Sequence, residues 1–157
     1  MTWLEAKLSP EGMNQSNYER DFYAWATEQA ALLRAGRLAE ADIAHIAEEI
    51  ETMGRSEKRE LVSRLKVLLM HLLKWRFQPT GRSTNWRLTV AEQRREVIDH
   101  LADNPSLRAR MDEAIASAHA GAILGAARET GLDLGQFPDR CPWSYEQIVD
   151  RVFWPEM

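Results

Sequence analysis

Histidine and carboxylate side chains recur at one-turn spacing in two places along the chain, and such side chains bind metal ions in helical proteins. Asp42, His45 and Glu49 are three and four residues apart, which places them along one face of a helix. Glu96 and His100 repeat the one-turn spacing. Helix bundles build metal sites from inward-pointing carboxylates and imidazoles. We expect the first group to lie beside the buried face, solvated or ion-paired, and we predict no metal site. The weak candidates for metal ligands are His45, Glu49, His71 and His100.

His71 differs from the other histidines because it lies in the most apolar stretch of the chain, residues 68–73. A buried imidazole needs a hydrogen-bond partner, so we expect His71 to pair with a carboxylate or a backbone carbonyl. A ligand or proton-transfer role is the alternative. Nucleophilic catalysis has little support, since Cys141 has no histidine near it in the sequence. We assign no catalytic residue and no cofactor, and the sequence favours a protein without enzymatic activity.

Positive charge is concentrated in the middle of the chain. Residues 55–95, the basic segment, hold 11 basic and 3 acidic side chains, whereas residues 1–54 hold 4 and 10 and residues 96–157 hold 5 and 11. One interpretation is ion pairing between the basic segment and acidic helices nearby. The other is a surface for an anionic ligand, because concentrated positive charge attracts phosphate and nucleic acid. Trp75 and Trp86 would stack on bases if their rings were exposed.

An apolar stripe with helical periodicity runs through residues 38–77. The stripe keeps its phase across Gly54, which favours one long helix. Gly54 followed by Ser56 would also suit a helix stop and a new N-cap, so two helices are the alternative. The apolar positions of the stripe are Ile43, Ile46, Ile50, Met53, Leu61, Leu65, Leu68 and Leu72.

Capping and stop residues delimit the other predicted helices. Ser16 and Glu19 have the spacing of a capping box, and Gly36 ends the helix that follows. Pro79 and Gly81 mark a loop. No β-strand pattern occurs in the sequence. The other predicted boundaries are a helix start near Asn85, an N-cap at Asn104 before Pro105, a stop at Gly131 and a capping box of Ser144 with Gln147.

A run of alanine, glycine and serine lies between Ala114 and Ala127. Small side chains allow a neighbouring helix to approach closely. We interpret this face as a tight contact within the chain, and a homodimer through the same face is the alternative.

The composition is that of a globular chain, with 157 residues of which 45% are hydrophobic and 28% are charged. A chain of this length can bury one substantial core. We predict the all-α class and a compact bundle of about five or six helices around one long central helix. Residues 1–15 are expected to form an irregular N-terminal arm, and residues 16–157 a single helical domain.

Cysteine content and the length of apolar stretches bear on location. Cys141 is the only cysteine, so no disulfide can form within the chain, and no basic, apolar leader opens the sequence. We therefore expect a soluble protein of the bacterial cytoplasm. The most apolar stretch, residues 65–75, contains two lysines and falls short of the roughly 18 to 20 apolar residues of a membrane span. No membrane association is expected.

Five stretches carry a family resemblance in the same order along the chain. They are residues 18–25, 32–37, 47–51, 71–75 and 137–142. Together they resemble the bacterial family called domain of unknown function 29, over about residues 18–155. The resemblance implies an all-helical bacterial protein and transfers no catalytic residue. Family members are most alike around His71 and around Glu48, so the resemblance makes these positions the first choice for a site.

The sequence thus predicts a non-catalytic binding or interaction protein with no identified partner. Binding of phosphate or nucleic acid through the basic segment is one alternative, and a metal-dependent helical-bundle enzyme is another. The residues of the candidate binding site are His71, Lys74, Trp75, Arg76, Arg82, Trp86, Glu48 and Glu49.

Overall fold

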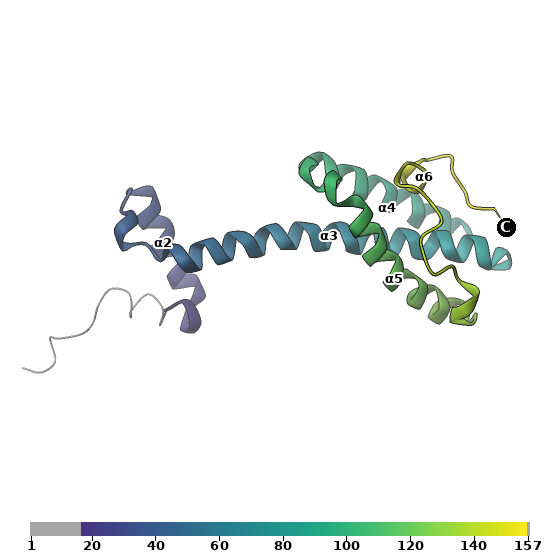
Figure 1. Cartoon of the computed structure of the whole chain (residues 1–157), viewed down its shortest axis with the longest axis horizontal. Helices are drawn as coiled ribbons and strands as arrows, with labels where there is room; N and C mark the ends of the chain where they lie inside the picture. The colour runs from purple at the N-terminus through teal and green to yellow at the C-terminus, as the bar shows by residue number, and fades with distance from the viewer. Residues whose placement is uncertain (1–16, 157) are drawn as a thin grey trace, which may run out of the picture. The chain divides into compact units, whose positions relative to one another are not determined.

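The computed structural model describes residues 17–156, and every regular element in that range is helical (Figure 1). The predicted all-α class is therefore confirmed. The contacts group into two compact units, residues 1–54 (the N-terminal unit) and residues 55–157 (the C-terminal unit), and each is described by itself. The predicted arm and the predicted cap at Ser16 lie outside the described residues. The single domain from residue 16 onward stays a prediction.

The first long helix of the N-terminal unit, α2, spans Phe22–Arg34. Residues 17–20 form a helical turn before it, and Asp21 leaves the helical conformation with φ −144° and ψ 81°. Its carboxylate accepts a hydrogen bond from the Ala24 amide at 3.0 Å, which is the geometry of an N-cap. The helix that was expected to run on from Ser16 is thus interrupted, because Asp21 begins a new one.

Gly36 ends α2, as the sequence predicts. Its φ of 71° lies in the left-handed region that glycine adopts without strain. The Gly36 amide donates to Leu33 O at 3.1 Å and the Arg37 amide donates to Leu32 O at 2.9 Å. This pair of bonds is a Schellman motif, which satisfies carbonyls that the end of a helix leaves open. A short 3₁₀ helix, η1 (Leu38–Glu40), follows.

The long helix α3 spans Ile43–Phe77 without a break at Gly54. Of the two alternatives for this region, one continuous helix is the observed one, although it begins at Ile43 and the 3₁₀ turn before it is separate. A glycine inside a helix costs about 1 kcal/mol relative to alanine. The residues around Gly54 are mostly good helix formers, which offset that cost. The boundary between the two units falls within this helix.

The apolar stripe of α3 is buried only in its second half. Leu61, Leu65, Leu68 and Leu72 have no exposed surface, whereas Ile43, Ile50 and Met53 are 54, 63 and 68% exposed. The expectation that the whole stripe is buried is therefore wrong for its first part. Helical periodicity indicates which residues share a face, but it does not indicate whether another element covers that face.

The C-terminal unit packs three further helices against the second half of α3 (Figure 1). Its core consists of leucines from α3, valines from α4, alanines from α5 and aromatic side chains of the residues after α5, which we call the C-terminal segment. None of the described helices is long and apolar enough to cross a membrane. The elements after α3 are η2 (Pro79–Gly81), α4 (Thr84–Asp103), η3 (Pro105–Arg110), α5 (Met111–Thr130), η4 (Leu134–Gln136) and α6 (Tyr145–Val149).

The predicted helix boundaries of this unit are mostly confirmed. Gly131 ends α5 with φ 73°, and Ser144 forms the predicted capping box with Gln147. Asn104 is the exception, because its side chain makes no N-cap bond to the residues after it, which form the 3₁₀ helix η3 before α5 begins. It donates instead to His100 O at 3.2 Å, at the end of α4. The helix expected from Pro105 therefore starts at Met111.

The small residues of α5 make the close internal contact that their sequence predicts. A Cβ atom at Gly121 would lie 3.0 Å from Lys66 Cε, and one at Gly125 would lie 2.6 Å from Met70 Sδ. Both neighbours belong to α3. Ala118 and Ala122 on the same face have no exposed surface. The contact with α3 thus accounts for these small residues, and a homodimer through the same face stays a prediction.

Candidate functional site

Lys74 is a buried cation at the end of α3 and one of the predicted site residues. Its side chain is 8% exposed, and Nζ donates to Glu129 Oε2 at 2.5 Å. Nζ also lies 4.4 Å from the ring centroid of Trp86, within the range of a cation–π interaction. Trp86 in turn packs on the loop, because a Cβ at Gly81 would lie 2.6 Å from its ring. Two predicted site residues are therefore in contact.

Trp75, the next predicted residue, is surrounded by cations and by a second indole. Arg82 donates from Nε to Trp75 O at 2.8 Å, and its guanidinium lies 4.9 Å from the Trp75 ring centroid. Arg87 lies 5.3 Å from the same centroid, and the rings of Trp75 and Trp154 are 4.3 Å apart. Trp75 is only 6% exposed. The condition for stacking of Trp75 on a base, an exposed ring, is therefore not met.

Of the other predicted site residues, His71, Arg76 and Glu49 have local partners. His71 is half-buried, and its Nδ1 lies 2.9 Å from Val67 O, so the predicted carbonyl partner is confirmed. Arg76 lies over the ring of Phe77, with 5.1 Å between the guanidinium carbon and the centroid. Glu48 is exposed and Glu49 half-buried, and both belong to the N-terminal unit.

The acidic and histidine side chains of the N-terminal unit form hydrogen bonds to one another and to aromatic residues. Asp42 Oδ2 accepts from Trp25 Nε1 at 3.1 Å and lies 2.7 Å from His45 Nδ1. Burial opposes ionisation of Asp42, but these bonds outweigh it and hold its pKa below the usual value. Tyr18 donates to Glu49 at 2.5 Å, and this bond raises the pKa of Tyr18 to about 12. Asp42 and His45 are therefore paired with each other, whereas Glu49 is hydrogen-bonded to Tyr18.

Metal-ligand geometry is not found among the weak candidates. His100 Nε2 lies 2.8 Å from the backbone oxygen of Glu57, and His45 is held by Asp42. Between residues 17 and 156, no three histidine, cysteine, aspartate or glutamate side chains converge as they would around a metal ion. The described residues therefore provide no cluster of metal ligands that supports the metalloenzyme alternative.

One buried histidine, His119, and one half-buried histidine, His71, make stability depend on pH. Burial lowers the pKa of His119 and of His71 below the ordinary 6.5. Below pH 6.5 the unfolded chain therefore binds protons that the folded chain does not, and stability falls as the pH drops. We expect the melting temperature to be lower at pH 5.5 than at pH 7.5, and the drop to be smaller in His119→Leu. An equal drop in the variant, measured by circular dichroism, would exclude His119 as a contributor.

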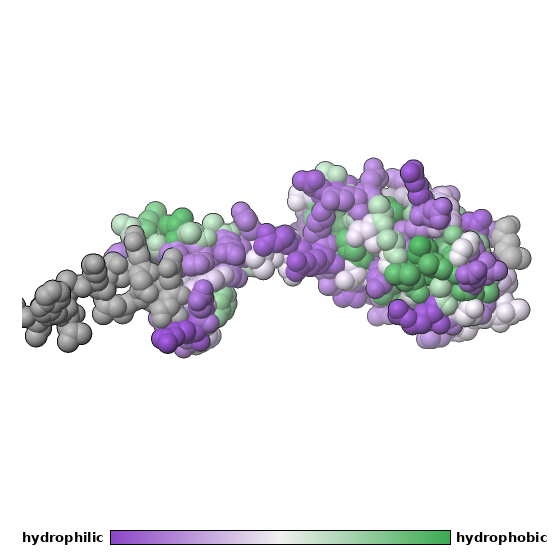
Figure 2. All heavy atoms as spheres, turned by 60° about the horizontal axis from the view of Figure 1, so that its bottom comes forward, coloured by the Kyte–Doolittle hydropathy of each residue, from purple (hydrophilic) through white to green (hydrophobic). Residues whose placement is uncertain are grey.

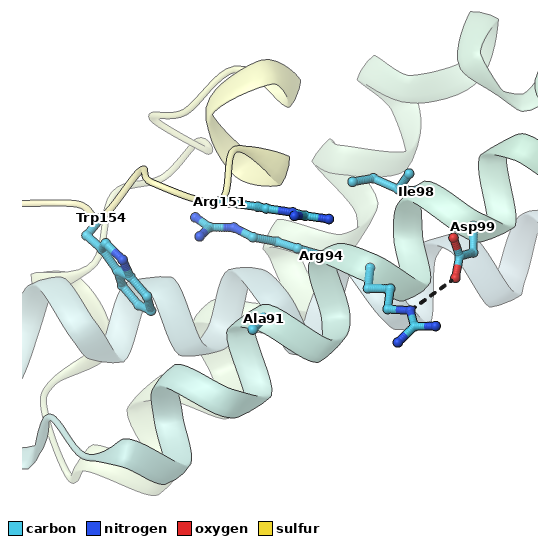
Figure 3. A pocket seen from close by; sticks show the side chains of 7 residues that line it. Ala91, Arg94, Ile98, Asp99, Arg151 and Trp154 are labelled. Carbon is cyan, nitrogen blue, oxygen red and sulfur yellow. Dashed lines mark ion pairs between the residues drawn. The ribbon is translucent and has the colours of Figure 1, made fainter.

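A cavity of about 470 Å³ lies between α4 and the segment that follows α6, within the C-terminal unit (Figure 3). We call it the arginine cavity, because three arginines line it. Figure 3 shows the side chains of Arg94 and Arg151 extending from different elements between Trp154 and Ile98. The residues that line the arginine cavity are Ala91, Arg94, Arg95, Ile98, Asp99, Arg151 and Trp154.

Arg94 is fixed by the backbone of the C-terminal segment. It is 3% exposed, and its Nε and Nη2 donate to Ile148 O at 2.8 Å and to Phe153 O at 2.7 Å. Its guanidinium lies 5.4 Å from the ring centroid of Trp154, the indole that packs on Trp75. Burial lowers the pKa of Arg94, but an arginine stays protonated at neutral pH. The cavity thus contains a positive charge whose position is fixed.

The arginine cavity and the cluster around Trp75 share Trp154, so they form one continuous region of the C-terminal unit. Sequence reasoning found the residues near the loop at positions 78–83, but it missed Arg151 and Trp154. The pair Arg94 and Arg95 was visible within the basic segment. Nothing in the spacing indicated that residues more than 50 positions later would lie beside it.

The basic segment is paired within the chain at several positions, which supports the ion-pairing interpretation there. Arg95 keeps 83% of its side chain exposed, with Asp99 3.7 Å away. Two pairs reach a neighbouring helix, α5: Lys58 with Glu113 at 3.1 Å and Lys74 with Glu129 at 2.5 Å. Arg64 pairs with Glu60 of its own helix at 2.8 Å.

Comparison with known proteins identifies a family and no characterised relative. No curated protein and no solved structure is significantly similar to this chain. One family model, described as a domain of unknown function, matches residues 17–154. That match includes all the residues of the arginine cavity and of the cluster around Trp75. Because it covers nearly the whole sequence, the chain belongs to the family Domain of unknown function DUF29.

Proposed function

We propose that this chain is a non-catalytic binding protein whose C-terminal unit binds a small anionic ligand in the arginine cavity. The observation that carries the proposal is that three arginines, from two separate parts of the chain, line one cavity. Asp99 is the one carboxylate among the residues that line it, and Arg95 lies 3.7 Å away. The cavity is therefore positive, and planar guanidinium groups match carboxylate and phosphate oxygens.

The rest of the lining indicates what the anion is attached to. Ala91, Ile98 and Trp154 contribute apolar and aromatic surface beside the arginines. A volume of about 470 Å³ is within the range of small-molecule sites. We therefore propose a ligand in which a phosphate or carboxylate is joined to an apolar or aromatic body.

Binding is favoured over catalysis by the chemistry of these side chains. Arginine neither accepts a proton at neutral pH nor acts as a nucleophile. Cys141 lies elsewhere in the unit, and burial raises the pKa of its thiol, which makes it less reactive. The described lining thus offers groups that hold an anion and no pair suited to acid–base catalysis.

Titration calorimetry with naphthalene derivatives tests the proposed ligand class. We expect 1-naphthyl phosphate and 1-naphthoate to bind, 1-naphthalenemethanol to bind much more weakly, and the affinity of the anions to fall with added salt. Equal binding of the neutral compound would contradict the proposal. Tighter binding of a single-stranded oligonucleotide, weakened by changes outside the cavity, would favour the nucleic-acid alternative.

Arg151→Ala is the variant that tests the position of the site. Arg151 is exposed, so its removal should leave the fold intact while removing one charged donor from the cavity. A hydrogen bond to a charged group contributes about 1.5–3 kcal/mol, so we expect affinity for 1-naphthyl phosphate to fall about tenfold to a hundredfold. Arg110→Ala, at an exposed arginine outside the cavity, is the matched control and should change affinity less than twofold. Equal losses in both variants would place the site elsewhere.

We also propose a cytoplasmic location in a bacterial cell. With one cysteine the chain cannot form an internal disulfide, so an oxidising compartment would not stabilise its fold in that way. The thiol of Cys141 is half-buried. Fractionation of cells that express the chain at its natural level would test this, and recovery outside the cytoplasm would contradict it.

A further inference from the structure

Most of the large apolar side chains in the described part of the N-terminal unit are exposed. In its described residues only Trp25 and Gln29 are buried. Apolar groups lie among hydrophilic ones on the visible face of this unit (Figure 2). A unit this small cannot build a large core, and clustered exposed apolar side chains commonly mark a binding surface. The exposed large hydrophobic residues of the unit are Phe22, Tyr23, Leu33, Leu38, Ile43, Ile50 and Met53.

One face of α3 within this unit has the pattern of a helix-packing surface. Ile43, Ala47, Ile50 and Gly54 follow at intervals of four, three and four residues, which places them on one face. All four are exposed, and a Cβ at Gly54 would meet no atom within 4 Å. The two isoleucines project while Ala47 and Gly54 leave room between and beyond them. Side chains of another helix can therefore pack into the spaces beside the two isoleucines.

The charge around this face selects the kind of helix that fits. Residues 17–54 contain eight acidic and three basic side chains. Glu48 follows Ala47 directly and is exposed, so it flanks this face. A partner with basic flanking residues is therefore complementary. An antiparallel pair with a second copy centred on this face would bring the two Glu48 side chains close together, which like-charge repulsion opposes.

We propose that the face formed by Ile43, Ala47, Ile50 and Gly54, the docking face, binds a basic amphipathic helix of another protein. The apolar side of that helix covers the isoleucines and the small residues between them. Its lysines or arginines lie beside Glu48. The docking face contains none of the residues of the arginine cavity, so the proposed anion site and the proposed docking face can be tested, and can fail, independently.

Binding of a defined peptide tests the chemistry of the partner. The probe is a labelled 18-residue peptide with leucines on one helical face and lysines elsewhere, measured by fluorescence anisotropy with the full-length chain. We expect it to bind, and a peptide with glutamates in place of the lysines, or a scrambled lysine peptide, to bind at least tenfold more weakly. Equal affinity of the three peptides would overturn the proposal, and so would the absence of binding.

Ile50→Ser and Glu48→Lys test the surface. Each is expected to weaken binding of the lysine peptide about tenfold, because one removes a central apolar contact and the other reverses a flanking charge. The matched control is Leu124→Ser, since Leu124 is 53% exposed on α5 in the C-terminal unit. An equal effect of Leu124→Ser, or no effect of Ile50→Ser, would overturn the assignment to this face.

Photo-crosslinking distinguishes the occupants of the docking face. A benzophenone amino acid is placed at position 50 of the full-length chain, and the products are identified by mass spectrometry with and without the lysine peptide. A cross-link to the peptide supports the proposal. A cross-link to a second copy that persists with the peptide, or to residues 1–16 of the same chain, would overturn it and identify that segment as the occupant.

Discussion

Arg94→Met is expected to lower the free energy of unfolding by about 2–4 kcal/mol, one of the two largest effects that we predict. The Arg94 side chain donates to two backbone carbonyls, Ile148 O and Phe153 O, which belong to the segment that closes the arginine cavity. Methionine keeps the apolar stem of the side chain but leaves both carbonyls without these donors. An unpaired buried polar group costs about 1–3 kcal/mol, so two of them account for the expected range.

The neighbouring residue gives a matched control for that variant. Arg95 lies on the same helix and lines the same cavity, but its side chain is 83% exposed. We expect Arg95→Met to change stability by less than about 0.5 kcal/mol, because exposed ion pairs contribute little. Urea denaturation of both variants measures the difference. Equal stabilities would show that the Arg94 hydrogen bonds do not hold the C-terminal segment in place.

Arg94→Lys separates charge from hydrogen-bond geometry. Lysine keeps the positive charge but presents one ammonium group where arginine presents a planar fork. Two different nitrogens of Arg94, Nε and Nη2, make the bonds to Ile148 O and Phe153 O, and the single nitrogen of an ammonium group cannot occupy both positions. We therefore expect a stability between those of the wild type and Arg94→Met. A stability equal to the wild type would attribute the effect to charge alone.

Helix ends were the most predictable part of the fold, because their chemistry is local. Gly36 and Gly131 adopt positive φ angles where the sequence predicts helix stops, and Ser144 caps α6 with Gln147 as expected. Each of these features depends on residues within one helical turn. Asn104 shows the limit of such reasoning, since Pro105 after it is equally compatible with the 3₁₀ turn that forms.

The candidate site was predictable only where its members are close in sequence. Lys74, Trp75, Arg82 and Trp86 are brought together because a short loop joins α3 to α4. Trp154 completes that cluster from the far end of the chain, and no periodic pattern links it to α3. Contacts of this kind depend on how the C-terminal segment crosses α4, which composition and spacing do not determine.

Leu72→Ala is the other large effect that we predict, with a loss of about 2–5 kcal/mol in the free energy of unfolding. Leu72 has no exposed surface and belongs to the main core of the C-terminal unit. Truncation to alanine removes buried methyl groups and leaves a cavity that the packed neighbours fill only in part. Alanine is a strong helix former, so the lower free energy of unfolding would result from lost packing and not from a less stable helix.

Ile50→Ala is the control that makes this prediction specific, because Ile50 occupies the same apolar stripe of the same helix. Ile50 is 63% exposed, so truncation removes little buried surface. The higher helix propensity of alanine offsets much of what is lost, and we expect a change within about 0.5 kcal/mol. Urea denaturation at a dilute and a tenfold higher protein concentration checks both variants. If Ile50→Ala cost as much as Leu72→Ala, and the cost grew with concentration, the docking face would already be covered by a second copy of the chain.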